Sequence, residues 1–495
     1  MKKKALAFAA AACAFGMLLS GCGSSNGSDT AAEGANIITA YNSEPQHPLI
    51  PGNTNETGGG KPVDLLFSRL ISFDAKGNAS NEVAESITAN DDATQYDIKL
   101  KDGWKFTDGT DVTAEPFTNL ELRGQRQERY GRLILLLHHQ GYDALQDTDN
   151  LKGDEQLEGL KIVNDHEFTV DLNKSDSVFA IKVGYSAFAP LPESFYDDTD
   201  AFGEAPVGNG PYKFQSWDHD NEIVLVKNPD YKGNRTPKND GVTFKVYTKD
   251  DAAYADIQSG ALDVMESVPA SATKTFETDE TVQAYNKAGS VIQQFTIPSS
   301  LKHFEAGTEE GTLRRQAISM AINRENICDK VLNGTGTPAV DFTSPLTPGY
   351  SDSLKGVGNL KYNEKKAKEL WEKANAISPW TSDDKLTFAY NADGGHETTY
   401  TAVVNSINNT LGSEVAATNP YPTFNDYRTA VSDRKVRAHS VAAGSRIIRP
   451  PKTTWWPITI PPPLMAMVPT MAITRIRSSM TCAPRLLPHR PPMSQ

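Results

Sequence analysis

Several residue patterns that mark common enzyme and metal-binding classes are missing from this 495-residue chain. It has no H-E-x-x-H motif, no paired cysteines and no G-x-S-x-G nucleophile elbow, which argues against a zinc site and an α/β-hydrolase. The run Gly58–Lys61 resembles part of a phosphate loop, but Pro62 follows it and removes a backbone donor. We therefore expect no catalytic residue, no metal and no cofactor.

Positive charge is also in short supply. The chain has 49 Lys and Arg against 62 Asp and Glu, which gives a formal net charge of −13. Binding to phosphates needs clustered cations, so this balance argues against a nucleic-acid partner. Two of the many carboxylates could in principle form a glycosidase pair, so a surface lipoprotein hydrolase is kept as an alternative. No pattern selects such a pair, and we expect a protein that is not an enzyme.

Cysteine occurs only four times. The first lies within Ala5–Leu19, an apolar run that follows three lysines and is shorter than the roughly 20 residues of a membrane span. The run ends in Leu-Ser-Gly-Cys22, which is similar to a bacterial lipoprotein signal. We expect residues 1–21 to be a signal peptide and Cys22 to carry the lipid. An ordinary secretory signal with a chance cysteine is the alternative.

The next segment, 22–36, is rich in Gly, Ser and Ala, which predicts a flexible tether between lipid and folded chain. We then expect the protein to be exported and lipid-anchored to the outer face of the cytoplasmic membrane, or on the periplasmic side. Of the other cysteines, Cys328 is expected to be a small buried hydrophobe on a helix.

Strand and helix patterns alternate along the rest of the chain, which predicts an α/β protein of at least two lobes. Expected strands cover 36–45 (running into a loop), 96–100, 166–172, 222–228 and 385–391. Expected helices cover 63–71, after a Gly-rich loop, then 250–260, 312–334, a stretch after Asn363, and 400–412. On the helix after Asn363, four apolar residues share one face: Ala367, Leu370, Trp371 and Ala374.

Six segments together resemble the extracellular solute-binding proteins of family 5, which serve oligopeptide and dipeptide ABC importers. In chain order they are LLFSRLISFDAKGN, LKDGWKFTDGTDVTAEPF, APVGNGPYKFQSW, LVKNPDYKGN, IQSGALDV and LRRQAISMAINRENI. The resemblance spans roughly residues 37–433. It implies a two-lobed periplasmic-binding-protein-like clamp of type II with an extra subdomain. Lobe I would cover 37–300, including the inserted subdomain, and part of lobe II would cover 301–437.

The resemblance also implies a function. The chain would be a monomeric binding component that captures peptides outside the membrane and delivers them to the permease subunits of an ABC importer. Two loops resemble ligand-facing loops of peptide-binding members: Asn55, Glu56 and Thr57 before the first helix, and Gly208 with Asn209 further on. An ordinary turn is the alternative for both loops. A carrier of an oligosaccharide or a nickel complex is the alternative within the family.

The resemblance fails in two places. Residues 119–140 contain four Arg and no Lys, although the chain around them mostly uses Lys. Residues 438–495 hold seven basic residues, no acidic residue and eleven of the 30 prolines. Shifting the reading frame forward by one base at Leu120–Glu128 permits WNYAANAKN, and shifting it back by one base at Gly444–Trp455 permits WQSDYPSAENYL. Both strings resemble family sequence, so we interpret the two segments as frame-shifted.

The second shift affects function directly. In peptide-binding members the Asp of the D-Y-P element pairs with the peptide's α-amino group, and here it would fall across the Arg446 and Ile447 codons. We therefore expect the chain as written to bind peptide weakly or not at all, and we expect 438–495 to be an aberrant, disordered tail. The alternative is a genuine Pro-rich interaction segment, which would have no family-like reading in another frame.

Overall fold

The computed structural model describes residues 36–54, 56–75, 77–117, 139–141, 157–287, 289, 291–341, 344–346, 350–444 and 471–474. All of them belong to one unit of the chain, Asn36–Gln495. The predicted signal peptide, Cys22 and nearly all of the predicted tether lie outside the described residues. So do 119–138 of the first unusual segment, and 445–470 and 475–495 of the second. Within the described ranges, no helix is both long and apolar enough to cross a membrane.

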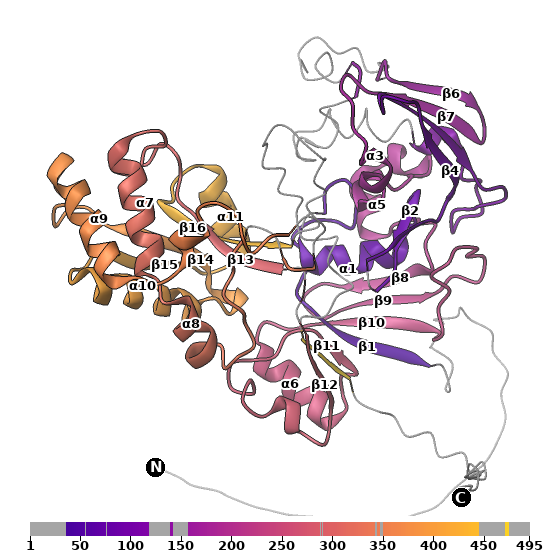
Figure 1. Ribbon diagram of the computed structural model, residues 1–495. Helices are drawn as coiled ribbons and strands as arrows, with labels where there is room; N and C mark the ends of the chain where they lie inside the picture. The colour runs from indigo at the N-terminus through magenta and orange to yellow at the C-terminus, as the bar shows by residue number, and fades with distance from the viewer. Residues whose placement is uncertain are drawn as a thin grey trace, which may run out of the picture. The chain divides into compact units, whose positions relative to one another are not determined.

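The first sheet has seven strands in the order β12-β17-β11-β1-β10-β9-β8. Its strands are β1 (Ile37–Asn42), β8 (Tyr212–Asp218), β9 (Glu222–Lys227), β10 (Gly241–Val246), β11 (Val264–Met265), β12 (Gln283–Asn286) and β17 (Met471–Thr474). β1 runs parallel to β10 and β11, and the remaining pairs are antiparallel. Helix α1 (Thr57–Leu66) packs beside β8 (Figure 1). Its Val63 and Leu66 join Ile223 and Leu225 of β9 in one core.

The second sheet has the order β4-β5-β7-β6 and is antiparallel throughout. Its strands are β4 (Ala84–Ala89), β5 (Gln95–Leu100), β6 (Leu160–Asn164) and β7 (Glu167–Asp171). In β5 the side chains of Tyr96, Ile98 and Leu100 are buried and those between them exposed, as the period of a half-buried strand requires. A small two-stranded sheet pairs β2 (Ile71–Phe73) with β3 (Ala79–Asn81).

The third sheet has four strands in the order β13-β16-β14-β15 and carries its own hydrophobic core. Its strands are β13 (Val291–Thr296), β14 (Leu386–Asn391), β15 (Ala416–Tyr421) and β16 (Ala438–Gly444). Three helices contribute buried residues to this core and are grouped around the sheet in Figure 1: α7 (Glu309–Ala321), α9 (Glu364–Ile377) and α10 (Glu397–Leu411). The buried face of α9 consists of Ala367, Leu370, Trp371 and Ala374, as its spacing predicts.

The remaining helical segments are short. They are α3 (Phe179–Lys182), α4 (Ser194–Asp197), α5 (Thr199–Glu204), α6 (Asp250–Ser259), α8 (Arg324–Asn326), α11 (Phe424–Ser432), η4 (Ser186–Phe188), η5 (Phe276–Thr278), η6 (Ile327–Val331), η7 (Val357–Leu360) and η8 (Ala392–Gly394). Gly260 and Gly412 end α6 and α10 in the left-handed conformation, which a glycine adopts without strain. Cys328 is partly buried in the π-helical turn η6, and its thiol is free.

Most predicted elements are confirmed, but the structure differs at two helices. The first helix starts at Thr57 rather than Val63, because Glu56 caps it, and Ile71 belongs to β2. The glycine run that was expected to be a loop is therefore its first turn. The helix expected over 312–334 is interrupted after Ala321, where the side chain of Asn323 accepts a hydrogen bond from the N–H of Asn326 and starts a new turn.

The structure also differs from the expectation of a disordered tail. Ala438–Gly444 forms β16, which pairs with β13 and β14, and Met471–Thr474 forms β17 between β11 and β12. The run from 438 to 444 is apolar enough to take an inner position in the sheet, and its backbone groups are then paired. The first seven residues of the unusual segment therefore belong to the folded domain.

Candidate functional site

The loop predicted to face the ligand leads into the N-terminus of α1. Asn55 lies outside the described residues. Glu56 is the N-cap of the helix, and Thr57 is its first residue. Three consecutive glycines complete the first turn, and all three are buried. This is the element from which the site is built.

Glu56 fixes the start of the helix. Its carboxylate Oε1 accepts hydrogen bonds from the N–H of Gly59 at 2.8 Å and of Gln46 at 3.3 Å, and the residue is only 6 % exposed. Burial raises the pKa of Glu56 above its ordinary value, and the backbone donors partly offset this effect. One carboxylate thus joins the helix to the segment that follows β1.

A side chain from outside the helix compensates for the proline inside α1. Pro62 has no N–H, so the carbonyl of Gly58 lacks its usual helical donor. The side-chain Nδ2 of Asn42, at the end of β1, donates to that carbonyl at 2.9 Å. The approach is close, because a Cβ at Gly58 would lie 2.6 Å from the carbonyl oxygen of Ser43. A side chain at position 58 would therefore push the helix away from the segment after β1.

Lys61 brings a buried positive charge to the same turn. Its side chain is 11 % exposed, its ammonium forms an ion pair with Glu266, and Nζ donates to the carbonyl of Tyr41 at 3.0 Å. Nζ also lies 5.0 Å from the centre of the Tyr41 ring. Burial lowers the pKa of Lys61 from 10.5 to about 7, although the negative charges of Glu56 and Asp250 act to raise it. Sequence reasoning missed this lysine, because its partners lie far along the chain.

The second predicted loop lies at the opposite end of α1. Gly208 is packed so tightly that a Cβ there would be 2.0 Å from the carbonyl oxygen of Leu66, the last helical residue. The amide of Asn209 accepts from the N–H of Ser68 at 2.8 Å and donates to its carbonyl at 3.2 Å. A ten-residue helix is roughly 15 Å long. The structure therefore does not bring the two predicted loops together, and it gives Asn209 a structural role.

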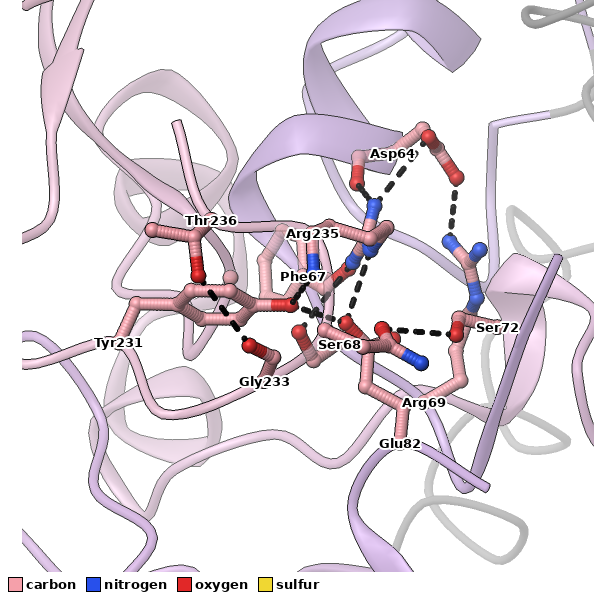
Figure 2. A network of polar contacts seen from close by, with 12 residues as sticks. Asp64, Phe67, Ser68, Arg69, Ser72, Glu82, Tyr231, Gly233, Arg235 and Thr236 are labelled. Carbon is pink, nitrogen blue, oxygen red and sulfur yellow. Dashed lines mark hydrogen bonds and ion pairs between the residues drawn. The ribbon is translucent and has the colours of Figure 1, made fainter. Parts of the chain in front are cut away.

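A buried ionic network holds this C-terminal end of the helix (Figure 2). The guanidinium of Arg235 donates to Glu82 at 2.8 Å, to the carbonyl of Asp64 at 2.7 Å and to the carbonyl of Phe67 at 3.0 Å. The hydroxyl of Tyr231 donates to the same carboxylate of Glu82. Charged partners satisfy the carbonyls that the end of a helix leaves without donors.

The charges of this network shift the pKa of Asp64. Burial alone would raise the pKa of its carboxyl group, but the charges of Arg69 and Arg235 hold that pKa below its ordinary value of 3.8. Asp64 Oδ1 accepts from Nη1 of Arg69 at 2.6 Å. The network is therefore a structural core of paired charges.

The chemistry available at α1 is that of binding. The helix start carries a capping carboxylate and one buried ammonium, and no nucleophile lies beside a base among these residues. Across the part of the chain that the structure describes, no group of three or more His, Cys, Asp or Glu is placed to hold a metal ion.

Comparisons with known proteins agree with a binding role. The family profile described as bacterial extracellular solute-binding proteins, family 5 Middle, matches residues 78–459. The oligopeptide-binding protein OppA of Bacillus subtilis is 25% identical over 426 residues, which cover 82% of this chain and 74% of the relative. The oligopeptide-binding protein AppA of the same organism is 28% identical over 425 residues, with 80% and 72% covered.

Solved structures show the same fold. The murein tripeptide binding protein MppA of Escherichia coli superposes with a TM-score of 0.69 at 22% identity, covering 83% of this chain and 79% of that protein. This match confirms the predicted α/β fold of the two-lobed binding proteins. Together with the profile match over most of its length, it identifies the chain as a member of the bacterial extracellular solute-binding proteins, family 5.

Proposed function

We propose that this chain is the peptide-binding component of an ABC importer. The observation that carries the proposal is the family match, together with two relatives whose names specify oligopeptides and which cover most of the chain. In such a carrier, ligand binds better to a closed form than to an open one, and this difference in affinity drives capture. The protein binds and releases its cargo unchanged, so it is not an enzyme.

Ligand contact at the start of α1 is proposed from the family resemblance, and the exposure of Thr57 is compatible with it. Glu56 and Thr57 stand where the chain enters the glycine turn; Glu56 is buried, whereas Thr57 is exposed and offers its polar groups to a peptide main chain. Asn55 is assigned to the same loop by resemblance. Gly208 and Asn209 stay predicted ligand contacts, but they are the weaker candidates. Their contacts with Leu66 and Ser68 already explain why these residue types occur there.

The anchor and the partners complete the proposal. Lipid on Cys22 would hold the protein at the outer face of the membrane, where it delivers peptide to permease subunits as a monomer. Globomycin blocks the peptidase that cleaves lipoprotein signals. Expression with the drug should therefore leave residues 1–21 attached, and mass spectrometry of the untreated protein should show a diacylglycerol on Cys22. Release of a lipid-free chain cut elsewhere would contradict the anchor.

The chain as written is proposed to be a damaged form of this carrier. Permitted codons allow parts of both unusual segments to be read as family-like sequence in another frame, and the Asp that would pair with a peptide amine would then fall across the Arg446 and Ile447 codons. The coding DNA tests this point first. If the codons of Gly444–Trp455 cannot encode WQSDYPSAENYL one base back, the frame hypothesis is wrong.

Ligand identity is tested on a frame-restored chain. The protein is purified under native conditions, denatured, and its released small molecules are identified by mass spectrometry. Peptides are the expected cargo. An oligosaccharide or a nickel complex in their place would move the chain to another carrier type on the same fold.

A further inference from the structure

The first turn of α1 is poorly held by its own sequence. Gly58, Gly59 and Gly60 each disfavour helix by about 1 kcal/mol relative to alanine, and they offer no side chains to pack. Pro62 removes one further hydrogen bond from this turn. The position of the turn must therefore be set by groups outside it.

Three side chains supply those contacts. Glu56 accepts from the N–H of Gly59 at 2.8 Å, and Asn42 donates to the carbonyl of Gly58 at 2.9 Å. Lys61 follows the glycines directly and is bonded to the carbonyl of Tyr41 at 3.0 Å and to Glu266. Of these three, Lys61 alone connects the turn to both β1 and the segment after β11.

Three carboxylates interact with the ammonium. Glu56 lies on its own helix, Asp250 begins α6, and Glu266 follows β11. Asp250 is itself held by the hydroxyls of Tyr41 at 2.9 Å and Ser267 at 3.0 Å. Removing the ammonium would leave Glu266 without this ion pair and would remove the positive charge that acts on Glu56 and Asp250.

We propose that Lys61 is a positioning residue, which holds the first turn of α1, from the N-cap Glu56 and Thr57 through the glycines, in the geometry that meets the ligand. Its ion pair with Glu266 and its bond to Tyr41 lock the turn against the first sheet. The part of this inference that concerns the ligand rests on the proposed function. The part that concerns the turn does not.

Hydrogen exchange in the ligand-free, full chain tests the turn. Fragments covering Gly58–Gly60 are followed at pH 6, 7.5 and 9, with exchange expressed relative to the intrinsic rate at each pH. Lys61→Met should lower protection about 10-fold at pH 6, as expected for losing a hydrogen bond to a charged group. The difference should shrink toward pH 9, because Lys61 loses its proton above about pH 7.

Two further variants keep the test decisive. Glu266→Gln should produce a similar loss even if Lys61→Met folds poorly, and Lys61→Arg should restore protection and remove the pH dependence. Lys368→Met is the matched control, because that lysine pairs with Glu364 on the exposed face of α9. Equal protection in wild type and both the Lys61→Met and Glu266→Gln variants at pH 6 would overturn the proposal.

Calorimetry with tetra-alanine tests the functional part, on a frame-restored chain. Lys61→Met should weaken binding at least 10-fold at pH 6, since the loop is then no longer held in place. If wild type binds and the variant binds equally well, the positioning role in ligand capture is refuted. If wild type does not bind tetra-alanine or any captured peptide, the proposed function fails, while the exchange result still decides the role of Lys61 in the turn.

Discussion

At the scale of single residues, the capping role of Glu56 leads to a prediction about stability. Its carboxylate serves two backbone N–H groups inside a buried site. Glu56→Ala should lower the free energy of unfolding by about 1–2 kcal/mol, the range for losing a helix N-cap. Urea denaturation at pH 7 measures it, with the exposed Glu372→Ala as control. An unchanged midpoint for Glu56→Ala would contradict the capping role.

The same residues show what a sequence can and cannot predict. Glu56 and Thr57 could be selected as candidates from a local pattern, because they lie in the segment before an apolar helical stretch. In the sequence, Lys61 looks only like the end of an incomplete phosphate loop. Its role could not be predicted, because Glu266 and the carbonyl of Tyr41 become its neighbours only after β1 and β11 pair. Asn42 is likewise recognisable as the partner of Gly58 only in the folded chain.

At the scale of elements, α1 depends on the ionic network at its C-terminal end. Arg235→Met would leave the carboxylates of Asp64 and Glu82 buried without this cation. Breaking such a buried pair costs about 3–5 kcal/mol, and Lys cannot supply the same set of donors. Thermal unfolding should show a large loss for Arg235→Met and little rescue by Arg235→Lys. Arg437→Met, at an exposed position, should be near neutral.

Asp64 gives this network a defined pH dependence. Because the folded-state pKa lies below the ordinary value of 3.8, the carboxylate contributes stability that is fully present above that value. The contribution is lost as pH falls through the lowered folded pKa. Melting temperatures from pH 7 to pH 2.5 should therefore fall more steeply for wild type than for Asp64→Asn, which starts lower. Parallel curves would show that Asp64 is not ionised in the folded protein.

Element prediction worked where periodicity was strong and failed where tertiary contacts decide. The alternating pattern of β5 and the apolar face of α9 are local signals, and the structure confirms both. The start of α1 depends on a cap and on Asn42, and the interruption after α7 depends on Asn323. The strand Ala438–Gly444 was missed because composition placed the boundary of the unusual segment at its first residue.

At the scale of the whole molecule, family membership could be inferred from sequence because its signature segments recur in order along much of the chain, and the profile match confirms it. The ligand is harder to infer, since those segments build the scaffold. The proposed grip on a peptide amine depends on one carboxylate that the chain as written does not encode. If the frame hypothesis holds, the missing carboxylate removes the charge-assisted contact on which the proposed peptide binding depends.

Calorimetry of tetra-alanine and N-acetyl tetra-alanine, against the chain as written and a frame-restored chain, tests this account most directly. The restored chain should bind the free-amine peptide, and acetylation should weaken binding about 100-fold, since it removes the charge that the Asp would pair with. The chain as written should bind both peptides weakly or not at all. Tight, amine-dependent binding by the chain as written would contradict the account.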